Sequence, residues 1–217
     1  MQATRPFAYQ RIPTDHPGLM WGAGSKVVDD NGYLLPVFRG QHGAHEHWSE
    51  TRLGSLSFGS AEAASLYAMQ PNDRRMAVQT PKVFPVFLDI RNPFVASGDD
   101  PFMDLSRYSE VFGIEETIRI AVKFKDYVEH TNAWEELQPE HGSVENLAAT
   151  KPELLLELYF EVYALLDDPE EVARLRAAGF DGAIHGGSGE TAMEAEYRVF
   201  SVEQVRSVWD MELTGSI

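Results

Sequence analysis

The feature that most constrains the fold is a helical block that separates two groups of short strands. Residues 100–178 show helical periodicity and helix-end signals: Asp168 before Pro169 fits a helix start, and Gly179 fits the position after a helix end. Apolar runs typical of strands lie before the block and after it. Because these strands must pair across the block to bury their apolar faces, the pattern predicts an α+β domain with a helical insertion, not alternating βαβ units.

The expected elements follow from local patterns. Short apolar runs predict strands over residues 34–38, 55–58, 85–90, 182–184, 197–200 and 205–209. Ser60 is typical of a helix N-cap, and the alanine-rich residues 61–68 after it predict a short helix. Inside the block, we expect helices over residues 115–129 and 150–166, the second capped by Thr150.

Size and composition exclude several classes of protein. A chain of 217 residues fits one domain, with residues 1–33, rich in Pro, Gly and Asp, as an irregular arm. The absence of cysteine excludes disulfides, thiolate zinc sites and a cysteine nucleophile. A net charge of −16 repels nucleic acid, so we do not expect direct nucleic-acid binding. Without a long apolar run or a signal-like start, we expect no membrane partner and a cytoplasmic location, in the producing cell or a target cell.

Two early segments carry residues suited to a nucleotide. Arg39 follows the first predicted strand, and its guanidinium offers a planar fork of donors to phosphate or ribose. Gly40, which we expect in a turn, lets a ligand approach the backbone. The second predicted strand presents hydroxyl groups and leads through Phe58 into the helix that carries Tyr67. Each segment alone also fits an ordinary surface turn or strand-to-helix connection.

The third segment contains two glutamates at the start of a late strand. Glu194 and Glu196 are two residues apart, so in a strand they point to the same side. Two close carboxylates repel, which raises one pKa or requires a nearby cation. Such a pair marks a site, although paired glutamates also occur at solvated strand edges. His185 precedes two glycines; it could approach the site, but a turn is the position that we favour for it.

No metal site is expected. The cluster His42, His45 and His47 lies on a predicted loop without the spacing of a helical zinc motif, and no cysteine can assist it. The lack of a G-x-G-x-x-G after any strand also disfavours the doubly wound dinucleotide fold. A bound dinucleotide would therefore need another architecture.

Together the three segments resemble the mono-ADP-ribosyltransferases of the arginine–serine–glutamate class, as found in phage and bacterial effector proteins. That class has an arginine on a first strand, a serine-containing strand and a Glu-x-Glu on a late strand. The turn over residues 179–182 and the strand over residues 86–93 are also similar to the family, and the resemblance covers residues 34–93 and 178–210. The family's usual Ser-Thr-Ser is here Ser55-Leu56-Ser57, and of the two serines we favour Ser57.

The resemblance implies a split β-sheet core of the ADP-ribosyltransferase type and a reaction that uses NAD as substrate, without a metal. Glu196 would stabilise the ribosyl cation, and Arg39 would hold the pyrophosphate or ribose. Phe58 or Tyr67 would stack on nicotinamide, and Glu194 would take a proton from the acceptor. We therefore expect Arg39, Ser57 and Glu196 to converge on one cleft.

The expected activity is transfer of ADP-ribose from NAD to a target protein, with an arginine side chain as the favoured acceptor and nicotinamide as the leaving group. Two alternatives remain open at this stage. An NAD glycohydrolase would use the same site with water as acceptor. A non-catalytic acidic interaction protein would use the negative charge to occupy a basic partner.

Overall fold

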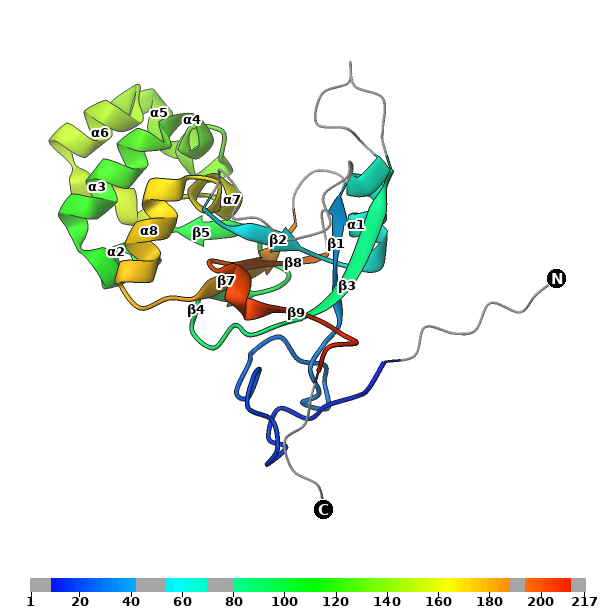
Figure 1. Cartoon of the computed structure of the whole chain (residues 1–217). Helices are drawn as coiled ribbons and strands as arrows, with labels where there is room; N and C mark the ends of the chain where they lie inside the picture. The colour runs from blue at the N-terminus through cyan, green and yellow to red at the C-terminus, as the bar shows by residue number, and fades with distance from the viewer. Residues whose placement is uncertain (1–8, 42–53, 70–79, 188–193, 212–217) are drawn as a thin grey trace.

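The structure is a computed structural model of the chain, and it describes residues 9–41, 54–69, 80–187 and 194–211. It has a mixed α+β fold, as the sequence predicts. A cluster of helices lies beside two small sheets, and the N-terminal arm extends from the opposite end of the molecule (Figure 1).

The first sheet is antiparallel and has the strand order β1-β3-β9. Its strands are β1 (Val37–Gln41), β3 (Lys82–Leu88) and β9 (Val205–Ser207). Helix α1 (Ala61–Met69) lies against β1 and β3. The hydroxyl of Ser60 accepts the Ala63 N–H at 3.0 Å, which is the N-cap that the sequence predicts.

The second sheet has the order β2-β8-β7-β4. It contains β2 (Leu56–Phe58), β4 (Pro93–Ser97), β7 (Gly182–Gly186) and β8 (Ala195–Val199), with only the β4–β7 pair parallel. Strand β4 was not expected, because Pro93 suggested the end of a strand; proline is tolerated as the first residue of one. Strands from both sides of the helical block pair in both sheets, which confirms the expected pairing across the block.

The two sheets share a buried apolar cluster that includes Val86 of the first sheet and Phe58 of the second, and a backbone bridge joins their strands. Phe38 and Gly59 exchange two backbone hydrogen bonds, of 2.8 and 3.0 Å, just where β1 passes the end of β2. This bridge brings Arg39 beside Ser57, although 18 residues separate them in the sequence. It therefore decides which side chains of the two sheets meet.

The block between β4 and β7 contains most of the helices. They are α2 (Leu105–Phe112), α3 (Ile114–Lys123), α4 (Lys125–Val128), α5 (Asn132–His141), α6 (Val144–Thr150), η1 (Pro152–Glu157), α7 (Val162–Leu166) and α8 (Pro169–Ala177); a short η3 (Val202–Gln204) precedes β9. Asp168 accepts the N–H groups of Glu170 and Glu171 and so caps α8, as expected.

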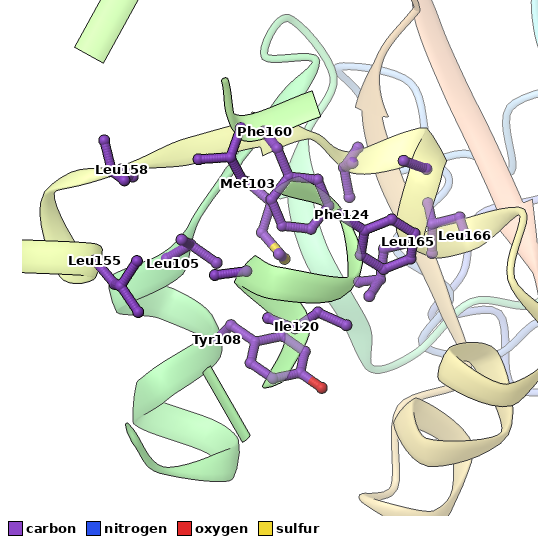
Figure 2. Close-up of a cluster of buried hydrophobic side chains, with 14 of the residues drawn as sticks. Met103, Leu105, Tyr108, Ile120, Phe124, Leu155, Leu158, Phe160, Leu165 and Leu166 are labelled. Carbon is purple, nitrogen blue, oxygen red and sulfur yellow. The ribbon is translucent and has the colours of Figure 1, made fainter. Parts of the chain in front are cut away.

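The block has a dense apolar core that continues into the second sheet. Figure 2 shows its centre, where Tyr108 and Ile120 face Phe124 and Phe160. The same cluster of buried residues includes Phe94 of β4, together with Ala183 of β7 and Phe200. The helices therefore do not form a detached unit; they complete the core on one side of the sheet.

The predicted helix over residues 150–166 is wrong. Thr150 ends α6 and caps nothing, and the segment after it divides into η1, strand β6 (Tyr159–Glu161) and α7. Strand β6 pairs antiparallel with β5 (Phe102–Asp104) and buries Phe160 completely. This long-range pairing outweighs the local preference of a leucine-rich segment for helix.

Three other expectations need a smaller correction. The first strand lies three residues later than expected, so Arg39 and Gly40 are inside β1 and not in a turn. The helix over residues 115–129 is interrupted at Phe124, which separates α3 from α4. Residues 9–33 form no helix or extended strand, as expected for an arm, but Ile12 packs against Phe87 behind the first sheet.

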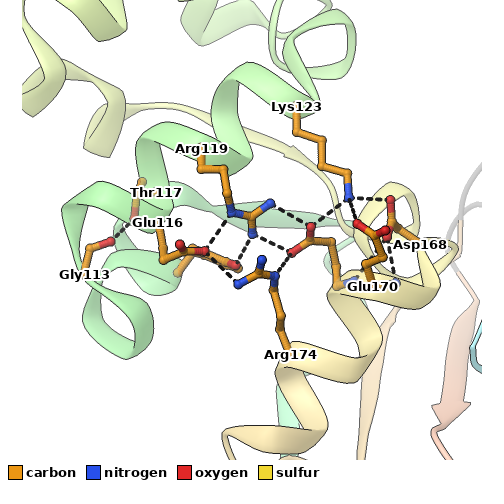
Figure 3. Close-up of polar contacts among 10 residues, drawn as sticks. Gly113, Glu116, Thr117, Arg119, Lys123, Asp168, Glu170 and Arg174 are labelled. Atoms are coloured by element: carbon orange, nitrogen blue, oxygen red, sulfur yellow. Dashed lines mark hydrogen bonds and ion pairs between the residues drawn. The ribbon is translucent and has the colours of Figure 1, made fainter.

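A buried carboxylate of α8 fastens this helix to α3, and Figure 3 labels its partners Arg119 and Lys123. The side chain of Glu171 is 1% exposed and accepts hydrogen bonds from Arg119, at 2.7 and 2.8 Å, and from Lys123, at 2.8 Å. Burial by itself would raise the pKa of Glu171, but the bonds from Arg119 and Lys123 outweigh it and lower this pKa below its ordinary value.

This pKa direction predicts how stability changes with pH. Because the folded-state pKa of Glu171 is lowered, its stabilisation is present above the ordinary glutamate pKa and is lost as the pH falls through the lowered value. We expect Glu171→Gln to lose up to about 3–5 kcal/mol at pH 7, and the gap to the parent protein to shrink below about pH 4. Urea unfolding at several pH values measures this. Glu170→Gln, whose side chain is 83% exposed, is the matched control. If the difference in free energy of unfolding between Glu171→Gln and the parent protein does not vary with pH, the stabilising role of the Glu171 carboxylate is contradicted.

Candidate active site

A cavity of about 340 Å³ opens between β1, β2, the start of β8, helix α1 and the end of α7. Its volume falls in the range of small-molecule pockets, roughly 300–1,000 Å³. Among its lining residues are all those that the sequence singled out: Arg39, Gly40, Ser57, Phe58, Tyr67, Glu194 and Glu196. The structure thus brings together side chains from three distant segments.

Glu196 is held by two donors on one of its oxygens. The Ser57 hydroxyl donates to Oε1 at 2.7 Å, and Nε of Arg198 donates to the same oxygen at 2.6 Å. From the described part of the chain, no hydrogen bond reaches Oε2. The carboxylate is therefore fixed by one oxygen, and the other remains available to a ligand.

The surroundings of Glu196 keep it ionised. Its side chain is 18% exposed, and burial by itself raises its pKa. The charges of Arg198 and His185 and the hydrogen bonds from Ser57 and Arg198 together outweigh burial, so the pKa of Glu196 lies below its ordinary value. At neutral pH the cavity therefore contains a fixed negative charge.

Arg39 supplies a cation with no carboxylate partner among the described residues. Its Nη1 donates to the Ser57 carbonyl oxygen at 2.8 Å, and its guanidinium lies 5.7 Å from the centre of the Phe58 ring. Its buried Nε has no hydrogen-bond partner in the described part of the chain. Burial lowers the pKa of Arg39, yet an arginine remains charged at any physiological pH. A half-buried, uncompensated guanidinium favours an anionic ligand.

Of the two aromatic residues, Tyr67 is the one within reach of a ligand. It lies on α1 and lines the cavity, and 47% of its surface is exposed. Phe58 also borders the cavity but is only 2% exposed, because it is packed in the core beneath Arg39. Tyr67 can therefore stack on a ring, whereas Phe58 forms a wall.

The second glutamate has its own serine. The hydroxyl of Ser60, which caps α1, also donates to Oε2 of Glu194. Glu194 and Glu196 both line the cavity, each held by a serine of the β2–α1 segment. Ser57, and not Ser55, is the serine that contacts Glu196; the Ser55 hydroxyl donates to the carbonyl of Leu166 instead.

Sequence analysis missed two charged residues around Glu196, Arg198 and Asp167. Arg198 points to the same side of β8 as Glu196, and its Nη1 donates to Asp167 at 2.7 Å. Strand alternation alone could have indicated Arg198. Asp167 carried no such signal, because it follows α7 in the helical block and reaches the cavity only through the tertiary fold.

The expectation for His185 is wrong, since this residue lies within β7 and not in a turn. It stands opposite Glu196 in the β7–β8 pairing, and its side chain is 2% exposed. Its Nε2 is 3.9 Å from Oε1 of Glu196, and burial lowers its pKa. His185 is therefore a neutral neighbour of the carboxylate at pH 7.

The comparisons add no relative. The chain matches no protein-family model, no curated protein and no solved structure. Within the described ranges, no helix is long and apolar enough to cross a bilayer, and no three His, Asp or Glu side chains are placed to share a metal ion. The cluster His42, His45 and His47 lies outside the described residues.

The structure gives Gly40 a packing role. A Cβ at this position would lie 1.9 Å from the carbonyl oxygen of Ala64, so only glycine allows α1 to approach β1 this closely. Whether its backbone also meets a ligand stays a prediction.

We expect Gly40→Ala to displace α1 and to destabilise the protein by about 1–3 kcal/mol or more. Thermal melting measures the loss. Gly59→Ala is the matched control, because there the nearest atom to an added Cβ, that of Ala63, is 3.4 Å away. Equal melting temperatures for Gly40→Ala and the parent protein would rule out the packing role.

Proposed function

We propose that the protein is an NAD-dependent mono-ADP-ribosyltransferase with Glu196 as the catalytic carboxylate. The observation that carries this proposal is one chain of contacts: Arg39 donates to the Ser57 backbone, and the Ser57 hydroxyl donates to Glu196. These contacts join the arginine, the serine and the glutamate that the resemblance to the family singles out, which supports the proposal. The two small sheets joined at Phe38 and Gly59 also agree with the split-sheet core of that family.

The charges of the cavity support binding of a dinucleotide. NAD has an anionic pyrophosphate and a positively charged nicotinamide ring. For the pyrophosphate, Arg39 offers a cation that has no carboxylate partner in the described structure. For the nicotinamide ring, the exposed ring of Tyr67 offers a stacking surface. In a chain with a net charge of −16, a cation placed in the cavity is needed to bind an anionic substrate.

Glu196 would act on the bond between nicotinamide and ribose. When that C–N bond breaks, its electron pair goes to the nicotinamide ring nitrogen, and positive charge develops on the ribose carbon. A fixed carboxylate beside the ribose stabilises this charge without reorganisation. Ser57 and Arg198 occupy Oε1, so the other oxygen is the one that can face the ribose.

Glu194 would act on the acceptor. A nitrogen of a target arginine forms the new bond to the ribose carbon, and its proton passes to the Glu194 carboxylate. Ser60 holds this carboxylate on the same side of the cavity as Glu196. If water were the acceptor, the same site would be that of an NAD glycohydrolase.

One experiment separates the three candidate activities. Purified protein is incubated with labelled NAD⁺, with and without cell lysate, and free nicotinamide and labelled protein are measured by mass spectrometry. A transferase labels a protein in the lysate and releases little nicotinamide alone, whereas a glycohydrolase releases nicotinamide without a target. No label and no nicotinamide under either condition would leave the acidic interaction protein and refute the proposal.

The two glutamates are expected to differ in their effects. Glu196→Gln should reduce both transfer and NAD⁺ hydrolysis by about 10²–10³-fold while NAD⁺ still binds, because it removes the charge beside the ribose. Glu194→Gln should reduce transfer but leave slow hydrolysis, because it acts only on the acceptor. Glu170→Gln, on the exposed face of α8, is the control. Normal transfer by Glu194→Gln would contradict both the role of Glu194 as proton acceptor and the preference for arginine as the target residue.

Arg39 is expected to act in binding. Arg39→Ala should weaken NAD⁺ binding by about 1.5–3 kcal/mol through loss of a charge-assisted contact, and Arg39→Lys should recover only part of it. Calorimetric titration with NAD⁺ gives both values. If both variants bind NAD⁺ like the parent protein, Arg39 only supports the Ser57 backbone.

A further inference from the structure

Arg198 is a buried cation shared between two carboxylates. The residue is 6% exposed, and its guanidinium donates to Glu196 through Nε at 2.6 Å and to Asp167 through Nη1 at 2.7 Å. Nη1 also approaches the Ser55 hydroxyl at 3.3 Å. Burying a guanidinium is costly unless it is paired, and here both partners line the cavity.

Asp167 comes from the helical block. It is the C-cap residue of α7, and the residue after it caps α8. The last carbonyl of α7, that of Leu166, accepts the Ser55 hydroxyl at 2.8 Å, which ties this end of the helix to the start of β2. The block therefore contacts the site at a defined point, through one carboxylate.

We propose that Arg198 is a positioning residue for Glu196, and that Asp167 anchors it, so that the helical block sets the orientation of the catalytic carboxylate. The catalytic part of this inference rests on the proposed function. The geometry of Glu196 itself does not.

Asp167 also offsets part of the positive charge that Arg198 places beside Glu196. An arginine paired with Glu196 alone would cancel the negative charge that a ribosyl cation needs. With Asp167 as second partner, the group of Arg198, Glu196 and Asp167 has two negative charges and one positive charge. Glu196 is thus held firmly by Oε1 while the group keeps a net negative charge.

Other charged or titratable groups also surround Glu196. They are His185 on β7, Glu194 just before β8, Arg39 on β1 and Tyr67 on α1. Arg39 forms no ion pair with Glu196 in the described structure, and His185, whose Nε2 is 3.9 Å from Oε1 of Glu196, has a pKa lowered by burial and so adds little charge at pH 7. Arg198 is therefore the group whose removal changes Glu196 most.

The test measures Glu196 directly and catalysis separately. The variants are Arg198→Gln, Arg198→Lys and Asp167→Asn, with Arg91→Lys as control, because Arg91 also pairs with a carboxylate, that of Asp89, but does not line the cavity. NMR titration of the ¹³C-labelled side-chain carboxylates, with Glu196 assigned by Glu196→Gln, gives its pKa. The kcat and KM for NAD⁺ cleavage are measured on the same samples, and thermal melts check folding.

We expect Arg198→Gln to raise the pKa of Glu196 and to lower kcat by up to roughly 100-fold with little change in KM, the order of loss when a reacting group is misplaced by about 1 Å. Arg198→Lys should restore part of the pKa shift but little of kcat, because a point charge does not replace the fork. Asp167→Asn should lower kcat without raising the pKa of Glu196, because it removes a neighbouring negative charge.

Two results would overturn the inference. One is an unchanged Glu196 pKa in a folded Arg198 variant, and the other is an unchanged kcat in Asp167→Asn. If Arg198→Gln does not fold, the pKa of Glu196 is compared between Arg198→Lys and the parent protein instead. If the parent protein cleaves no NAD⁺, the proposed function fails, whereas the titration still decides whether Arg198 controls Glu196.

Discussion

The backbone bridge between Phe38 and Gly59 is the contact on which the site depends. The two sheets pack through a common buried apolar cluster, and this bridge fixes how their strands are placed at the edge beside the cavity. Because β1 and β2 meet there, the Arg39 guanidinium reaches the backbone of Ser57, whose hydroxyl reaches Glu196 on β8. Close packing of α1 on Gly40 then closes the other side of the cavity. Each step is short and directional, so the cavity is organised before any ligand enters.

The distribution of charge within this cavity differs from that of the chain as a whole. The chain is strongly acidic, yet two guanidinium groups border the same cavity. They are used in opposite ways: Arg198 is shared by two carboxylates, whereas Arg39 has none among the described residues. A paired buried arginine fixes geometry, and an unpaired one attracts an anion. These two roles of arginine agree with the proposed substrate, NAD, which has both an anionic pyrophosphate and a cationic ring.

The helical block is part of the same architecture. Its core includes side chains of β4 and β7, so the second sheet is covered on one side by helices. The Glu171 network fastens α8 to α3, and α8 begins two residues after Asp167. Asp167 lies between the end of α7, which Ser55 contacts, and the start of α8, which the Glu171 network holds, and both contacts determine its position. A block that the sequence shows only as an insertion therefore supplies a charged group to the cavity.

The sequence by itself determined the features that depend on near neighbours. The caps at Ser60 and Asp168 and the shared side of Glu194 and Glu196 follow from local spacing. The pairing of strands across the block was predicted without its register, because both groups of strands must bury their apolar faces. Only the tertiary structure decided the features that depend on distant partners. Strand β6 replaced a helix because β5 pairs with it, His185 became buried because β7 pairs with β8, and Asp167 reached Arg198 because α7 ends beside β8. Such contacts join residues far apart in the chain, and no local pattern records them.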